Sequence, residues 1–174
     1  YNIGTGPDYA GEANVMIGQQ AGYYVTGSDN TFVGAAAGRG GTTSAPYSSG
    51  DGNVAVGYHA LRQITTGGGN TVIGRSAGYG LTTGLDNVVI GIEAVVTGPI
   101  GNYNIVIGGD SLKNGSTEVE KNVVIGRAAA NYLKGQHSVI IGYQAGNYAT
   151  GSNNILVGYQ AGFGGTTSAP YSSG

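Results

Sequence analysis

Residues 87–91 of this chain have the sequence NVVIG, and residues 104–108 have the closely similar sequence NIVIG. The phrase Asn-x-x-Ile/Val-Gly occurs eight times along the chain, and a ninth copy carries Ser138 in place of the asparagine. Self-similarity at a short and nearly constant period indicates a repeat architecture in which each unit packs on its neighbours. The copies end on glycines that are 16, 23, 17, 17, 17, 18, 16 and 16 residues apart, namely Gly18, Gly34, Gly57, Gly74, Gly91, Gly108, Gly126, Gly142 and Gly158.

A repeat of 16 to 18 residues is too small to have a hydrophobic core of its own. Each copy contains a short apolar strand and glycine-containing turns, and glycine with β-branched residues at this density disfavours helix. The sequence therefore predicts an all-β fold, a parallel β-solenoid or β-roll of about nine stacked coils. Because stacked strands lie about 4.8 Å apart, nine coils would form a rod on the order of 40 Å long.

Stacking places equivalent residues of successive coils above one another, so each repeated residue forms a column. We expect the asparagines to form a ladder of side-chain amides that hydrogen-bond from coil to coil, as in cross-β stacks. We expect the closing glycines to form corners where a Cβ atom does not fit or where φ is positive.

The three residues between asparagine and glycine form a strand whose middle position is apolar in all nine copies. Side chains alternate between the two faces of a strand, so a coil with a wet exterior should alternate apolar and polar residues. Continuous apolar runs are instead typical of strands buried on both faces. We interpret the middle column as an inter-chain stripe covered by sister chains, in a homotrimer or alternatively a dimer. The stripe consists of Met16, Phe32, Ala55, Val72, Val89, Val106, Val124, Ile140 and Leu156.

The whole chain, residues 1–174, is predicted to be a single repeat array. Residues 138–174 repeat residues 14–50 with 26 of 37 positions identical. The one long spacing, 23 residues, indicates a loop inserted at about residues 39–52, and residues 164–174 would begin a second such loop. We expect the chain to be an excerpt of a longer fibre.

Composition excludes several classes of function. With 7 basic and 9 acidic side chains and a net charge of −2, the chain has no basic field for nucleic acid. It has no cysteine, hence no disulfide or thiolate metal site, and no apolar run approaches the ~20 residues that span a bilayer. We expect no cofactor, no metal site and no membrane insertion.

The repeats resemble those of known surface fibres. The phrases NVAVGYHAL at residues 53–61, GYQAG at 142–146 and GYQAG at 158–162 are similar to head repeats of trimeric autotransporter adhesins and to repeats of bacteriophage tail fibres and bacterial surface fibres. The resemblance implies a left-handed, trimeric β-roll in an extracellular cell-surface or virion fibre, a non-enzymatic structural or adhesive segment that mediates attachment. It departs from the adhesin heads in its longer coils, and a triple β-spiral shaft is the alternative fold.

Two patterns suggest an enzyme, and neither is convincing. Residues 74–78, GRSAG, match the G-x-S-x-G nucleophile elbow, but stacking would place Ser76 between His59 and Glu93, whereas a triad needs the histidine in the middle. The second alternative is a solenoid enzyme of the acyltransferase kind that uses His137, but the aliphatic hexapeptide repeats of that class are missing. We expect both histidines to be solvated or turn residues and the protein not to be an enzyme.

Tyrosines recur at fixed places in the repeat and are the candidate ligand contacts. Exposed rings could contact a glycan or receptor, which makes a carbohydrate- or receptor-binding module with a Pro46 loop the alternative function. The rings could instead cover coil corners and pack on one another, the interpretation we favour. The candidate contacts are Tyr47, Tyr58, Tyr143, Tyr159 and Tyr171.

Overall fold

The chain folds as a β-solenoid of about 8 turns with about 17 residues per turn. A computed structural model describes residues 11–41, 47–117 and 119–164, and within these ranges it contains nine strands and no helix. Every strand is three residues long and lies between an asparagine or serine and a glycine. The strands are β1 (Val15–Ile17), β2 (Thr31–Val33), β3 (Val54–Val56), β4 (Thr71–Ile73), β5 (Val88–Ile90), β6 (Ile105–Ile107), β7 (Val123–Ile125), β8 (Val139–Ile141) and β9 (Ile155–Val157).

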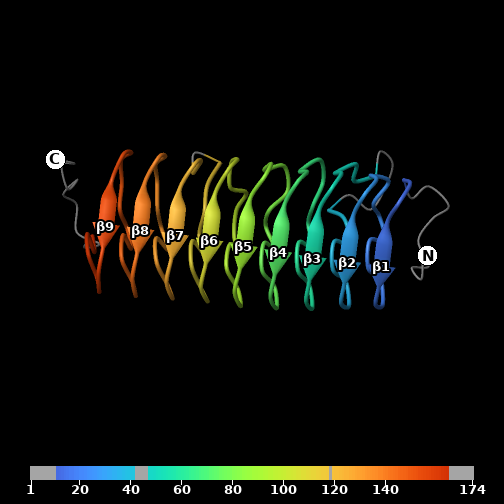
Figure 1. The fold of residues 1–174 in the computed structure, drawn as a ribbon, viewed down its shortest axis with the longest axis horizontal. Coiled ribbons are helices and arrows are strands. Elements are labelled where there is room, and N and C mark those ends of the chain that lie inside the picture. The colour runs from blue at the N-terminus through green and yellow to red at the C-terminus, as the bar shows by residue number, and fades with distance from the viewer. Residues whose placement is uncertain (1–10, 42–46, 118, 165–174) are drawn as a thin grey trace.

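All nine strands form one parallel sheet in chain order, each pairing with the next. Figure 1 shows that the strands run across the long axis of the rod, with β1 and β9 at opposite ends. The register is kept even across the inserted loop, because Thr31 pairs with Val54 in the same way as Val88 pairs with Ile105. This arrangement confirms the predicted solenoid and shows that the triple β-spiral alternative is wrong. The hand of the coil and the trimeric state stay predictions.

The asparagine column forms the predicted amide ladder inside the solenoid. Asn87 is fully buried, and its Nδ2 donates to Oδ1 of Asn70 at 3.1 Å and to the carbonyl oxygen of Gly101 at 3.0 Å. Its own Oδ1 accepts from the backbone N–H of Asn104 at 2.8 Å and from the Nδ2 of that residue at 3.0 Å. Each amide therefore satisfies its buried donors and acceptors through neighbouring coils.

The glycine column forms the predicted corner. Gly74 has φ of +134°, and a Cβ atom added there would lie 2.6 Å from the carbonyl oxygen of Gly91 in the next coil. Both reasons for glycine therefore hold together, since neither the backbone angle nor the space would admit a side chain.

The interpretation of the middle column as an inter-chain stripe is wrong. Met16 to Ile140 of that column are buried inside their own coils, and Leu156 in the last coil is partly buried against the same core. The reason is the inward direction of the asparagines: residues i and i+2 of a strand share a face, so an inward amide places the middle residue inward as well. The first and third residues of each strand therefore point outward.

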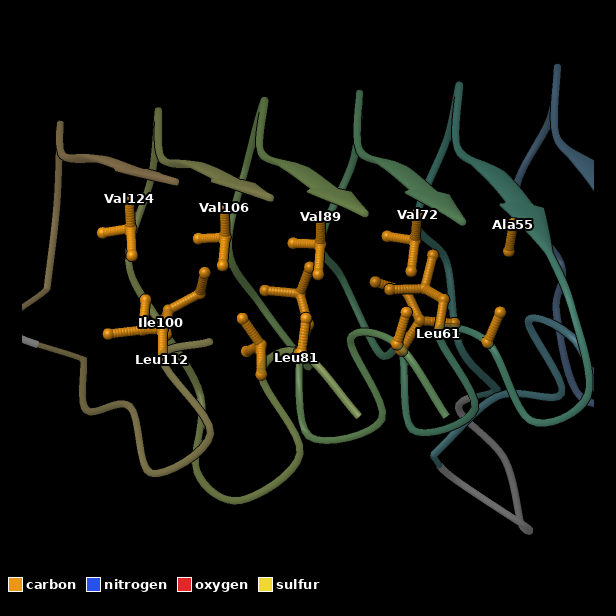
Figure 2. Close-up of a cluster of buried hydrophobic side chains, with 14 of the residues drawn as sticks. Ala55, Leu61, Val72, Leu81, Val89, Ile100, Val106, Leu112 and Val124 are labelled. Carbon is orange, nitrogen blue, oxygen red and sulfur yellow. The ribbon is translucent and has the colours of Figure 1, made fainter. Parts of the chain in front are cut away.

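The core lies between the sheet and the opposite wall of each coil. Figure 2 shows Val72, Val89 and Val106 directed from the strands toward Leu81 and Leu112 on that wall. A column of small residues lines the corner after each repeat glycine, and its members from coils one to eight are buried. These are Ala21, Ala37, Ala60, Ala77, Ala94, Ser111, Ala129 and Ala145. The small side chains allow the two walls to approach closely, so the interior is filled along the described rod.

Candidate functional site

The outer face of the sheet is the largest regular surface of the molecule. It consists of the first and third residues of nine strands, which makes eighteen positions, and all of them are aliphatic except Thr31 and Thr71. No charged side chain occurs among them. These residues are half-buried by their neighbours or exposed, with Ile73 and Ile105 each 39% exposed and Val157 63% exposed. The face is therefore apolar and solvent-facing over its full length.

The size of this outer sheet face can be estimated from strand geometry. Nine strands at about 4.8 Å and three residues at about 3.3 Å give a face of roughly 40 by 10 Å, or about 400 Å². Exposed apolar rings and side chains border it directly after the repeat glycines, including Tyr58, Ile92 and Tyr159. Contiguous apolar patches of this size are often functional in monomeric proteins.

The tyrosines pack on one another, which confirms the interpretation that the sequence favoured. The rings of Tyr143 and Tyr159 stack with centroids 5.7 Å apart and planes inclined by 11°, and Tyr132 stacks on Tyr148 at 4.5 Å. Stacking along the rod covers ring faces and leaves edges and hydroxyls toward solvent. Of the candidate contacts, Tyr58, Tyr143 and Tyr159 are exposed.

The remaining candidates are placed differently. Tyr47 is half-buried, with its ring stacked on Tyr24 at a centroid distance of 6.2 Å. Pro46 and Tyr171 lie outside the described residues, as does most of the second predicted loop at residues 164–174.

The column that contains Ser76 does not form a catalytic triad. No hydrogen bond joins the Ser76 side chain to His59 or Glu93 in the described part of the chain, and His59 instead stacks on Tyr58 at 3.8 Å. His137 is exposed, as expected of a solvated histidine, whereas His59 is half-buried.

The carboxylates of this column are held in an ion-pair ladder. Nη2 of Arg75 lies 2.8 Å from Oε1 of Glu93, while Nζ of Lys113 lies 3.0 Å from Oε2 of Glu93 and 2.9 Å from Oδ1 of Asp110. The hydrogen bond from Lys113 is the main cause that lowers the pKa of Glu93. The two carboxylates are therefore joined by a shared cation and do not repel as an unpaired like-charge stack.

Two arginines form a cluster that we did not single out in the sequence. Arg39 and Arg62 each follow their repeat glycine by five residues, so they occupy the same place in neighbouring coils. The guanidinium carbon of Arg39 lies 4.9 Å from the ring centroid of Tyr24, and that of Arg62 lies 5.5 Å from the centroid of Tyr79. Numbering both residues from the repeat glycine would have revealed the alignment.

The charge of this arginine–tyrosine cluster affects the neighbouring imidazole. Burial, followed by the charges of Arg62 and Arg39, lowers the pKa of His59. Both arginines are therefore close enough to disfavour a further positive charge.

Other kinds of site are not formed by the described residues. Over residues 11–41, 47–117 and 119–164, no three His, Asp or Glu side chains are grouped so that they could hold a metal ion. The same part of the chain contains no helix long and apolar enough to cross a membrane.

Comparison with family models, with curated proteins and with solved structures finds no match for this chain. The site is therefore argued from its geometry.

Proposed function

We propose that this chain is a non-enzymatic structural and adhesive segment of an extracellular fibre, on a cell surface or a virion, in which copies associate side by side as a homotrimer. Its role is to hold attachment surfaces away from the body that carries the fibre. The observation that carries the proposal is the outer sheet face, an uncharged aliphatic surface that runs the length of the rod.

The rod itself is suited to a mechanical role. Successive strands are joined by backbone hydrogen bonds, and the buried amide ladder adds hydrogen bonds that run along the rod. Because the same contacts repeat in each coil, their strength grows with the number of coils. Such a stack suits a shaft better than an enzyme that must open and close.

Lateral association follows from the outer sheet face. Two such faces in contact would cover roughly 800 Å², below the 1,200–2,000 Å² of stable interfaces, so nine coils lie near the threshold and the bordering tyrosines and Ile92 must contribute. Parallel rods related by a rotation axis bring equivalent coils to the same height, and a trimer gives each chain two neighbours. Longer arrays of the same repeat would associate more strongly.

Sedimentation of the isolated chain over a range of concentrations tests this proposal. We expect the native chain to associate, and a variant with Ile73→Asp and Ile105→Asp to remain monomeric with an unchanged circular dichroism spectrum. A matched variant with Gln63→Asp and Thr83→Asp adds the same charge at exposed turn positions and should associate like the native chain. A native chain that stays monomeric at every concentration would overturn the proposal.

A further inference from the structure

The arginine–tyrosine cluster is an exception to the way this solenoid stacks charged side chains. Along the column that holds the ion-pair ladder, Glu93 lies between Arg75 and Lys113, so each charge meets an opposite one in the next coil. Arg39 and Arg62 occupy equivalent places in adjacent coils, and neither has a carboxylate within ion-pair distance among the described residues. Two like charges one coil apart disfavour the folded state unless something neutralises them.

The surroundings of the two guanidinium groups are aromatic. Arg39 lies over the ring of Tyr24, which in turn stacks on Tyr47 from the inserted loop. Arg62 lies over Tyr79, and its Nη1 donates to the hydroxyl oxygen of Tyr79 at 2.9 Å. These contacts hold both arginines in place and leave further N–H donors of each fork without a protein acceptor.

The burial of the two side chains supports the same conclusion. Both arginines are half-buried, and the Nε atom of each is buried without a hydrogen-bond partner. A partly dehydrated guanidinium with unsatisfied donors gains more from an anion than a fully solvated one does.

We propose that Arg39 and Arg62, with Tyr24, Tyr47 and Tyr79, bind an acidic saccharide through its carboxylate or sulfate group. Planar anions match the forked donors of arginine, and tyrosine rings and hydroxyls suit the mixed apolar and polar surface of a sugar. Two cations on a chain with net charge −2 suit a ligand with one or two negative groups better than a polyphosphate backbone. The site lies apart from the outer sheet face, so it does not depend on the proposed lateral association.

Calorimetric titration with defined oligosaccharides tests the site on the intact chain. The probes are a hyaluronan hexasaccharide with carboxylates, a heparin-derived hexasaccharide with sulfates, the neutral maltohexaose, and sodium sulfate. We expect one or both acidic sugars to bind, with affinity that falls as salt is raised, and the neutral sugar not to bind. Binding of free sulfate as tight as that of either sugar would show a simple anion site and overturn the saccharide assignment, as would tighter binding of a single-stranded oligonucleotide.

Variants locate the binding. Because a hydrogen bond to a charged group is worth about 1.5–3 kcal/mol, Arg39→Gln or Arg62→Gln should weaken binding by roughly tenfold or more. Arg127→Gln removes the same charge from an exposed position five coils from Arg39 and should bind like the native chain. Equal loss of affinity in all three variants would show a non-specific charge effect and would overturn the site.

The imidazole of His59 gives a second readout that does not depend on affinity. Because the two arginines help to lower its pKa, a bound anion that neutralises them should raise it, as followed by nuclear magnetic resonance. Saccharide binding that leaves the His59 signals unchanged would place the ligand elsewhere and overturn the proposal.

Discussion

A Cβ atom added at Gly38 would lie 2.5 Å from Cδ1 of Phe32, the middle residue of β2 in the same coil. Glycine and phenylalanine are therefore complementary: the large ring fills the space that the missing side chain leaves. The third coil reverses the arrangement, because there the strand carries Ala55 and the position equivalent to Gly38 is Leu61. Leu61 has φ of 51°, nearly the same as the 52° of Gly38, so the backbone of the corner is unchanged by the exchange.

We expect Gly38→Ala to lower the free energy of unfolding by about 2–4 kcal/mol, the sum of overpacking and of an L-residue in the left-handed region. Urea denaturation followed by circular dichroism measures this change. Gly109→Ala is the control, because a Cβ atom there would meet only the carbonyl oxygen of Ile92 at 3.6 Å, and the change should stay within about 0.5 kcal/mol.

The pairing of the two positions can be tested by a double-mutant cycle. We expect the combination of Phe32→Ala and Gly38→Leu, which reproduces the third coil, to be more stable than the sum of the single changes by about 1–3 kcal/mol. Simple additivity would mean that the two positions do not share their space.

The amide ladder makes a different demand on Asn87, whose side chain both donates and accepts. In Asn87→Asp the carboxylate would face the Asn70 Oδ1 and the Gly101 carbonyl oxygen, both of which now accept from Nδ2. We expect a loss of about 3–5 kcal/mol near neutral pH, the usual effect of a buried, uncompensated charge. Denaturant unfolding measures it, with Asn153→Asp as an exposed control.

Acid should partly rescue the Asn87→Asp variant. Burial raises the pKa of an aspartate at this place, so its stability is highest at low pH, where the protonated carboxyl donates, and falls as pH rises. A variant that is equally destabilised at every pH would show that the loss of shape, not of charge balance, is responsible.

The columns of the solenoid could be predicted because each depends on residues at one fixed place in the repeat. Asn87 and Gly74 behave as their spacing indicated, since parallel stacking carries any local requirement from coil to coil. The face of Val89 was predicted wrongly, because the apolar composition of the strand does not say which parity points inward. The buried amide of Asn87, two residues away, decides it.

The arginine–tyrosine cluster was open to sequence reasoning only in part. Arg39 and Arg62 share a column, so their alignment follows from the repeat glycines. The stacking of Tyr47 on Tyr24 does not, because Tyr47 belongs to the inserted loop, whose residues have no equivalent place in other coils. Insertions in a solenoid therefore have to be seen in the structure before their contacts can be argued.

The inward and outward faces of one strand can be compared with a pair of adjacent substitutions in β5. We expect Val89→Asp to destabilise the fold by about 3–5 kcal/mol, because it places an unpaired charge in the core. Ile90→Asp, on the outer sheet face, should change the stability of the monomer by about 1 kcal/mol or less. Thermal unfolding at low protein concentration measures both, and a larger effect of Ile90→Asp would contradict the assigned direction of the strand residues.

The stability of the fold should depend on His59 in mildly acidic solution. Burial and the charges of Arg62 and Arg39 lower its pKa below the ordinary value of 6.5, so the unfolded chain takes up a proton at higher pH than the folded chain does. Stability is therefore unaffected by this group above the ordinary pKa and falls as pH decreases through the interval down to the folded pKa. Urea denaturation across this interval should show the slope in the native chain but not in His59→Asn, a residue that tolerates the φ of 57° found there. An identical slope in the two proteins would assign the acid sensitivity to other groups.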